Sequence, residues 1–277
     1  MFDQANSIQR DVNLPQRSRG TGRLSVKQSN GATRIDSLYQ QGCSKIRIPT
    51  PRTAALEVIM INSSGGMTGG DRLNWTFELH DHTALTVTSQ ACERVYAATT
   101  DTAKTDIAIS VGKGAKLAWL PQETILFNQG SFARHLEVDL AVGAELLLIE
   151  PIIFGRGAMN EVVSHGHLKD RWRIRRGDRL IHAEDALFCG NIHQKLQSDW
   201  VSGGRVAVAN ILLIAPRAEG LCAAARQIIE GSGAASFWQD KLLIRLMATD
   251  SYELRKKLAP LINLLNNSTP LPKIWTL

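Results

Sequence analysis

The chain has 277 residues, a formal net charge of +6 and a hydrophobic content of 44%. A chain of this length can bury a sizeable core, in one large domain or two modest ones. It contains no run of about 18 apolar residues, which argues against a membrane-spanning helix. Its N-terminus lacks the apolar segment of a secretory signal. The basic balance favours a negatively charged partner without identifying it.

The cysteines are scattered along the chain, at Cys43, Cys92, Cys189 and Cys222. No Cys-x-x-Cys motif occurs, so we do not expect a structural zinc site. Scattered free thiols are typical of a reducing compartment. We therefore predict a cytoplasmic protein.

The first twenty residues are polar, carry several arginines and show no periodicity. Such a segment cannot bury an apolar face, so we predict a flexible N-terminus over residues 1–20. The remainder, residues 21–277, is predicted to be a single domain.

A glycine-rich segment, Asn62 to Asp71, separates two predicted strands, 54–61 and 73–79. Its glycines are Gly65, Gly66, Gly69 and Gly70, and two Gly-Gly pairs predict a backbone that bends twice. A Walker loop would need Gly-Lys-Ser/Thr here, and a dinucleotide fingerprint would need G-x-G-x-x-G before a helix. The simplest interpretation is a hairpin loop with a turn carboxylate, and the alternative is that Asp71 lies on a path for a metal ion.

A strand–turn–strand pattern recurs four times between residues 77 and 180. Each copy ends in a leucine shortly after the turn, and these are Leu85, Leu117, Leu146 and Leu180, spaced by 32, 29 and 34 residues. A period near 30 predicts stacked β-layers, and four ordinary hairpins are the alternative. The predicted fold class is therefore mainly β, with a stacked-strand, β-helix-like body, a repeat region over 54–190 and a few helices towards the C-terminus.

Helical patterns are confined mostly to the part after Asn210. The segment Leu221–Ile229 is rich in alanine and ends before Gly231, a typical stop signal. Asp250 with Glu253 resembles a capping box and predicts a second helix over 251–266. Pro260 is expected to kink or split that helix.

Two pairs of histidines each lie two residues apart, His80 with His82 and His165 with His167. On a strand such a pair shares one face and can act as weak ligands of nickel, copper or zinc. The simpler interpretation is that all four are polar turn residues.

A run of basic residues, Lys169, Arg171, Arg173 and Arg175, alternates with Asp170, Trp172 and Ile174. On a strand this pattern gives one basic face, which is either solvated or a docking face for an acidic protein or a nucleic acid. Nucleic-acid binding usually brings exposed aromatic residues or an RNP-like motif. Aromatic content is only 6% and no such motif occurs, so we rank nucleic-acid binding second.

Four carboxylates stand in or beside apolar segments: Asp71, Glu123, Glu150 and Glu184. Burying an unpaired carboxylate is costly, so such residues pair, bind a cation or face a water-filled cavity. A strand-end residue that reaches solvent is the alternative for each.

Three of these motifs together resemble one known family. They are the loop Ser64-Gly-Gly-Met-Thr-Gly-Gly-Asp71, the run Trp119-Leu-Pro-Gln-Glu-Thr-Ile-Leu-Phe127 and the terminal Pro272-Lys-Ile-Trp275. In order and spacing they resemble the urease accessory protein UreD family, also called UreH. The resemblance extends from about Gly20 to the C-terminus.

This resemblance implies a urease maturation factor that is not an enzyme. Such a protein bridges apo-urease to the accessory protein UreF, and through UreF to the nickel-carrying GTPase UreG. The resemblance implies no permanently bound cofactor, a nickel ion in transit, and neither a nucleic-acid nor a membrane partner. It suggests Asp71, Glu150 and Glu184, with Glu123, as residues of a nickel path, since weak oxygen ligands would not trap the ion.

Two other classes of function stay open. One is a nickel-storing chaperone that binds the metal through the histidine pairs. The other is a nucleic-acid-binding β-protein that uses the basic strand, for which binding would depend on salt.

Overall fold

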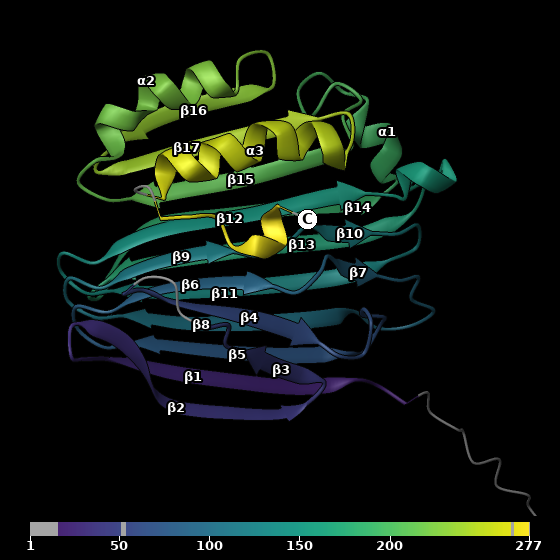
Figure 1. The fold of residues 1–277 in the computed structure, drawn as a ribbon. Helices are drawn as coiled ribbons and strands as arrows, with labels where there is room; N and C mark the ends of the chain where they lie inside the picture. The colour runs from purple at the N-terminus through teal and green to yellow at the C-terminus, as the bar shows by residue number, and fades with distance from the viewer. Residues whose placement is uncertain (1–15, 51–53, 267–268, 277) are drawn as a thin grey trace, which may run out of the picture.

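The computed structural model of the chain describes residues 16–50, 54–266 and 269–276. Two β-sheets face each other, and helices lie on the outer side of one of them (Figure 1). Residues 1–15 of the predicted flexible N-terminus lie outside the described residues. The first strand begins at Arg19.

Among the described residues, the first sheet has seven strands in the order β14-β13-β11-β8-β5-β1-β2. Their bounds are β1 Arg19–Ser29, β2 Ala32–Gly42, β5 Arg72–Leu79, β8 Ala103–Val111, β11 Ser131–Leu140, β13 Gly166–Arg176 and β14 Arg179–Gly190. The strands from β1 through β5, β8 and β11 to β13 run parallel to one another, and β2 and β14 close the two edges in antiparallel pairing.

The second sheet has ten strands among the described residues. Eight follow the order β16-β17-β15-β12-β9-β6-β4-β3, and β10 pairs with both β12 and β7. Their bounds are β3 Ser44–Arg47, β4 Leu56–Asn62, β6 Ala84–Ser89, β7 Glu93–Val95, β9 Lys116–Leu120, β10 Thr124–Leu126, β12 Glu145–Phe154, β15 Ala207–Ile214, β16 Gly233–Trp238 and β17 Lys241–Ala248.

The repeat is a solenoid, in which the chain alternates between the two sheets. The chain passes from β5 to β6, from β8 to β9 and from β11 to β12, each time leaving the first sheet for the second. In consequence Leu85, Leu117 and Leu146 are neighbours in parallel register and all are buried. The predicted stacked layers are therefore confirmed for three copies. The fourth is a hairpin within the first sheet, β13–β14, which leaves Leu180 exposed.

The space between the sheets is filled by the inward residues of alternating strands. Phe77, Ile109 and Val138 stack in register on the first sheet, and Phe77 meets the edge of Trp119 from the second sheet with ring centroids 5.6 Å apart. Period-two alternation places one side chain in every two towards this core.

The helices are α1 Ile192–Leu196, α2 Ala218–Ile228 and α3 Ser251–Leu265, with short 3-10 turns η1 Gly157–Met159 and η2 Lys273–Trp275. The predicted C-terminal helices are confirmed, although α2 begins three residues earlier than expected and Pro260 does not split α3. Asp250 caps α3 by accepting the Glu253 amide at 2.9 Å. The short elements α1 and η1 precede Asn210 and were not predicted.

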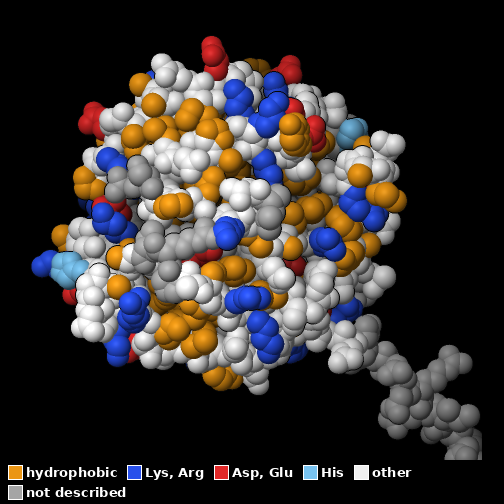
Figure 2. All heavy atoms as spheres, in the orientation of Figure 1, with side chains coloured by type: hydrophobic (Ala, Val, Ile, Leu, Met, Phe, Trp, Pro, Cys, Tyr) orange, Lys and Arg blue, Asp and Glu red, His pale blue; other side chains and the backbone are white. Residues whose placement is uncertain are grey.

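Helices α2 and α3 pack their leucines and alanines on the outer face of the second sheet. Figure 2 shows this side of the molecule, where hydrophobic side chains lie exposed among scattered lysines and arginines. The outer face of the first sheet is polar, since its strands alternate buried and exposed residues.

The glycine-rich segment joins β4 of the second sheet to β5 of the first. The interpretation as a hairpin loop was therefore wrong, while the predicted bend is present. Gly65, Gly66 and Gly70 have φ of +80°, +143° and +89°, which favours glycine. Gly69 does not need this freedom, but a Cβ there would overlap the carbonyl oxygen of Thr100.

Candidate functional site: a buried charge network beside a cavity

A cavity of about 180 Å³ lies between the two sheets. One part of its wall comes from the glycine-rich segment, with Asn62, Gly65 and Gly66, and another from the strands that carry Arg134 and Glu150. Because a water molecule takes roughly 30 Å³, this inter-sheet cavity has room for a few waters or a hydrated ion.

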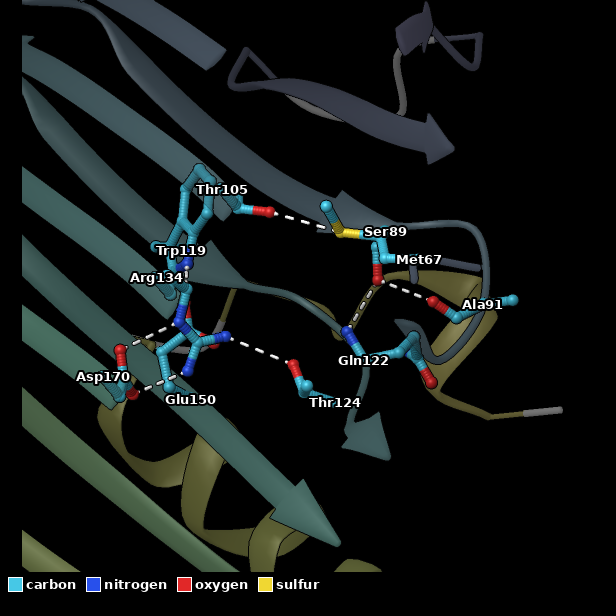
Figure 3. A network of polar contacts seen from close by, with 10 residues as sticks. All are labelled: Met67, Ser89, Ala91, Thr105, Trp119, Gln122, Thr124, Arg134, Glu150 and Asp170. Carbon is cyan, nitrogen blue, oxygen red and sulfur yellow. Dashed lines mark hydrogen bonds and ion pairs between the residues drawn. The ribbon is translucent and has the colours of Figure 1, made fainter. Parts of the chain in front are cut away.

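A network of three charged side chains lies at the inter-sheet cavity (Figure 3), and two of them, Arg134 and Glu150, line it. Arg134 and Asp170 are register neighbours on β11 and β13. The guanidinium donates from Nε to Asp170 Oδ1 at 3.0 Å and from Nη2 to Asp170 Oδ2 at 2.6 Å. Its Nη1 forms an ion pair with Glu150 Oε2 of β12 and donates to Thr124 Oγ1 at 3.3 Å. We call Arg134, Glu150 and Asp170 the triad.

The triad is almost fully removed from solvent, with Arg134, Glu150 and Asp170 only 5%, 1% and 3% exposed. Burial raises the pKa of Glu150 well above its usual range, Arg134 opposes this and Asp170 adds to it. The Trp119 indole donates to Glu150 Oε1 at 2.8 Å and favours the ionised form. Burial alone would lower the pKa of Arg134, but the charges of Asp170 and Glu150 raise it. The guanidinium therefore stays charged beside two acids.

A further carboxyl group, Glu93, also lines the inter-sheet cavity. It accepts hydrogen bonds from Asn62 Nδ2 at 3.1 and 3.3 Å. Burial raises the pKa of Glu93 to about 7, the Asn62 hydrogen bond lowers it and the charge of Asp71 raises it. The cavity therefore carries two carboxyl groups that titrate above the usual range for glutamate.

The other predicted path residues are held at separate places. Asp71 is buried, but both its oxygens accept hydrogen bonds from backbone amides, from Ser18 N before β1 at 2.7 Å and from Thr68 N of the bend at 2.8 Å. The carboxylate of Glu184 on β14 accepts hydrogen bonds from Arg245 Nη2 of β17 at 2.8 and 2.9 Å. Neither is among the described residues that line the cavity. Their positions favour structural roles in the bend and in the seam between the sheets.

Glu123 joins the solenoid to α3. Its carboxylate accepts hydrogen bonds from Arg255 Nε at 2.6 Å and from Arg255 Nη2 at 2.7 Å. The Cys92 thiol also donates to Glu123 Oε2, at 3.2 Å. Burial alone would raise the pKa of Glu123, but Arg255 outweighs burial and lowers it. This geometry is that of a bidentate ion pair.

The histidine pairs do not have the strand geometry that the sequence suggested. β5 ends at Leu79, and His82 lies in a turn with φ of +59°. His165 precedes β13, which contains His167. His80 contacts Ser25 Oγ at 3.1 Å and lies 3.9 Å from Asp36. Within the described ranges no group of three or more His, Cys, Asp or Glu residues is arranged to hold a metal ion.

The basic residues Lys169, Arg171, Arg173 and Arg175 do share the outer face of β13, opposite buried Asp170, Trp172 and Ile174. This face is not purely basic. Arg173 pairs with Asp185 at 2.5 Å, and β11 places Glu137 and Asp139 beside Arg173 and Arg175. Such mixed charge suits a protein partner better than a phosphate backbone.

Sequence reasoning missed Arg134, Asp170 and Glu93 as site residues. A signal for the first two was available, since Arg134 interrupts the apolar series Phe132, Leu136, Val138 and Asp170 interrupts Leu168, Trp172, Ile174 at the same parity. Two opposite charges on the inward faces of neighbouring parallel strands predict a buried pair. Glu93 lies in a three-residue strand and carries no such pattern.

The fold and the site define a class of protein: a two-sheet β-solenoid with an internal polar cavity and a buried ionic network. Residues 18–276 match the sequence model of the UreD urease accessory protein family. The chain therefore belongs to the UreD family of urease accessory proteins, and it acts in urease maturation.

Several urease accessory proteins are similar to this chain over almost its whole length. The urease accessory protein UreD of Agrobacterium fabrum is 48% identical over 262 residues, covering 95% of this chain and 92% of the relative. The UreD of Mesorhizobium japonicum is 45% identical over 268 residues, covering 95% and 96%. The UreD 1 of Brucella abortus is 46% identical over 266 residues, covering 95% of each. In the part of the chain that the structure describes, the helices are too short or too polar to cross a bilayer.

Proposed function

We propose that this protein is a cytoplasmic, non-enzymatic scaffold that bridges apo-urease to UreF, and through UreF to UreG, while nickel is delivered to the urease active site. Membership in the family supports the role in maturation. Nickel is the cargo in this proposal, and the protein keeps no permanently bound cofactor.

We further propose that the inter-sheet cavity is where nickel crosses the protein. The observation that carries this proposal is the position of Glu150. Its carboxyl group is 1% exposed and borders the cavity, and it belongs to a network with more acids than bases. Such a network favours a passing cation. Oxygen donors hold nickel weakly compared with a His/Cys cage, which suits transit.

The four predicted path residues do not contribute equally to this path. Glu150 remains the principal one, whereas Asp71, Glu123 and Glu184 use their oxygens in the contacts described above. For these three, substitution is expected to affect folding or docking of elements before it affects nickel.

Glu150→Gln and Glu184→Gln make a matched test, since each removes one charge at nearly constant volume. Glu150→Gln leaves the Arg134–Asp170 pair intact, so the fold is retained. In cells that co-express urease subunits, UreF and UreG, we expect Glu150→Gln to assemble normally in pull-downs but to lower the nickel content and activity of urease severalfold. Glu184→Gln should leave nickel content unchanged.

Two results would contradict the transit proposal. Full nickel loading by Glu150→Gln would remove Glu150 from any path. Loss of UreF or urease from the pull-down would assign Glu150 a structural role. Absence of urease from the wild-type pull-down would contradict the scaffold itself.

A further inference from the structure

The triad has an unequal number of acids and bases. A buried arginine that served only to tie two strands together would need one carboxylate, and Asp170 already provides two hydrogen bonds in a fork. Glu150 is a second acid on the same guanidinium, from the opposite sheet. Because burying an extra charge is costly, the second acid calls for an explanation beyond packing.

The guanidinium occupies the space where the two carboxylates converge. Its Nε and Nη2 donate to Asp170, and its Nη1 faces Glu150 and the Thr124 hydroxyl. The same oxygens, completed by waters from the adjoining cavity, form the kind of donor set that a divalent cation prefers. One divalent ion would also neutralise both carboxylates, which a single arginine does not.

We infer that Glu150 and Asp170 form a latent divalent-cation site that the guanidinium of Arg134 keeps occupied. Arg134 is in this sense a resident cation, which stops the inter-sheet cavity from retaining a metal ion. The binding chemistry is independent of urease, whereas its purpose, to keep a nickel path free of a trap, rests on the proposed function.

The test removes the resident cation. Arg134→Met keeps the length of an apolar stem but leaves both acids without their base. In equilibrium dialysis of the full-length chain against Ni²⁺ at neutral pH, we expect Arg134→Met to retain one more equivalent of metal than wild type. The added equivalent should be lost in Arg134→Met/Glu150→Gln and in Arg134→Met/Asp170→Asn. Binding at exposed histidines is common to all variants and cancels in the difference.

Equal retention by folded Arg134→Met and wild type would overturn the inference, and so would a gain that survives both double substitutions. Removing one partner of a buried ion pair can prevent folding, so Arg134→Gln, which keeps donors for Asp170, is the second variant. Recovery of the native circular dichroism only with Ni²⁺ would support the latent site. Failure of both variants to fold at saturating Ni²⁺ would overturn it, because a bound cation replaces the lost charge.

The outcome is separable from that of the transit proposal. A metal gain in Arg134→Met together with normal nickel loading by Glu150→Gln would keep the latent site and reject the path. No gain together with poor loading by Glu150→Gln would do the reverse.

Discussion

Carboxyl groups that are buried or half-buried in this fold differ in what offsets their charge. Glu123 and Glu184 each face an arginine, whereas Glu93 meets an amide and Glu150 shares one guanidinium with Asp170. An acid that lacks a full countercharge in a low-dielectric interior is less acidic. Protonation of Glu93 and Glu150 is therefore the chemistry that changes near neutral pH.

Glu93→Gln is expected to stabilise the protein at alkaline pH. The pKa of Glu93 is raised from 4.5 to about 7, so the folded state binds a proton that the unfolded chain has already released. Stability associated with this group is thus lost as the pH rises from about 4.5 to about 7. Removing the charge should gain about 1–3 kcal/mol at about pH 8 and nothing at about pH 4.

Thermal unfolding at the two pH values measures this difference. Glu137→Gln on the exposed face of β11 is the control for loss of a surface charge. A Glu93→Gln variant that is no more stable than wild type at alkaline pH would show that Asn62 and water compensate the charge fully.

His182 has the opposite pH dependence. Its ring lies between Trp172 and Trp238, 6.5 Å from each ring centroid. Burial lowers the pKa of His182; Glu184 raises it, and Lys241 and Arg245 lower it. Below about pH 6.5 the unfolded chain takes up a proton that the folded state resists, so stability falls as the pH falls.

His182→Phe should remove this acid sensitivity, because phenylalanine keeps the aromatic packing without a titrating group. We expect the melting temperature of His182→Phe to rise relative to wild type when the pH is lowered from about 7.5 to about 5. A gap between the two proteins that does not change with pH would contradict the prediction.

At the scale of elements, the connections decide the architecture. Parallel neighbours require a crossover, and here the crossover is a strand in the other sheet rather than a helix. The tight turns after β5, β8 and β11 therefore change sheets, whereas the turn after β13 does not. The bend at residues 62–71 returns the chain from β4 of the second sheet to β5 of the first, and it is fixed by Asp71 and by close backbone approach at Gly69.

Gly69→Ala and Gly65→Ala test that bend as a pair. A Cβ at Gly69 meets the backbone oxygens of Thr100 and Asp101, so a segment must shift, at a cost of about 1–3 kcal/mol. A Cβ at Gly65 meets open space and suffers only from its positive φ, at about 1 kcal/mol.

Urea or thermal unfolding should rank Gly69→Ala as the less stable variant. The reverse order would mean that backbone conformation rather than close approach limits the bend. Equal stability to wild type in both variants would contradict a structural role for the segment.

At the scale of the whole molecule, the two sheets have different outer faces. In the second sheet α2 and α3 cover the outer face at β15, β16 and β17, whereas β13 presents Lys169 and Arg175 on the open face of the first. A protein with net charge +6 that assembles with others can use such a face for steering and docking.

Lys169→Glu/Arg175→Glu is expected to weaken capture of the urease and UreF complex without lowering the melting temperature. Lys256→Glu/Lys257→Glu on α3 is the control, since it changes the net charge by the same amount, from +6 to +2. Co-purification with tagged urease subunits measures the effect. Equal capture by both variants would show that the β13 face does not dock a partner.

Much of the fold and a part of the site could be predicted from the sequence. Alternation predicted the strands and the inward face of each, the Leu85–Leu117–Leu146 spacing predicted the stacking, and Asp250 predicted the start of α3. Leu180 carries the same local signal but lies in a hairpin, at the start of β14, because turn chemistry does not specify which sheet the next strand joins.

The sequence by itself determined that carboxylates lie in apolar strands, that the chain is a stacked β-protein and which family it resembles. Only the tertiary structure decided which acids meet a base and which border a cavity. Period-two alternation fixes the face of a residue within its own strand. It does not fix which elements pack against that strand. The charge partners of Glu150 and Glu184 come from the opposite sheet, and the partner of Glu123 comes from α3.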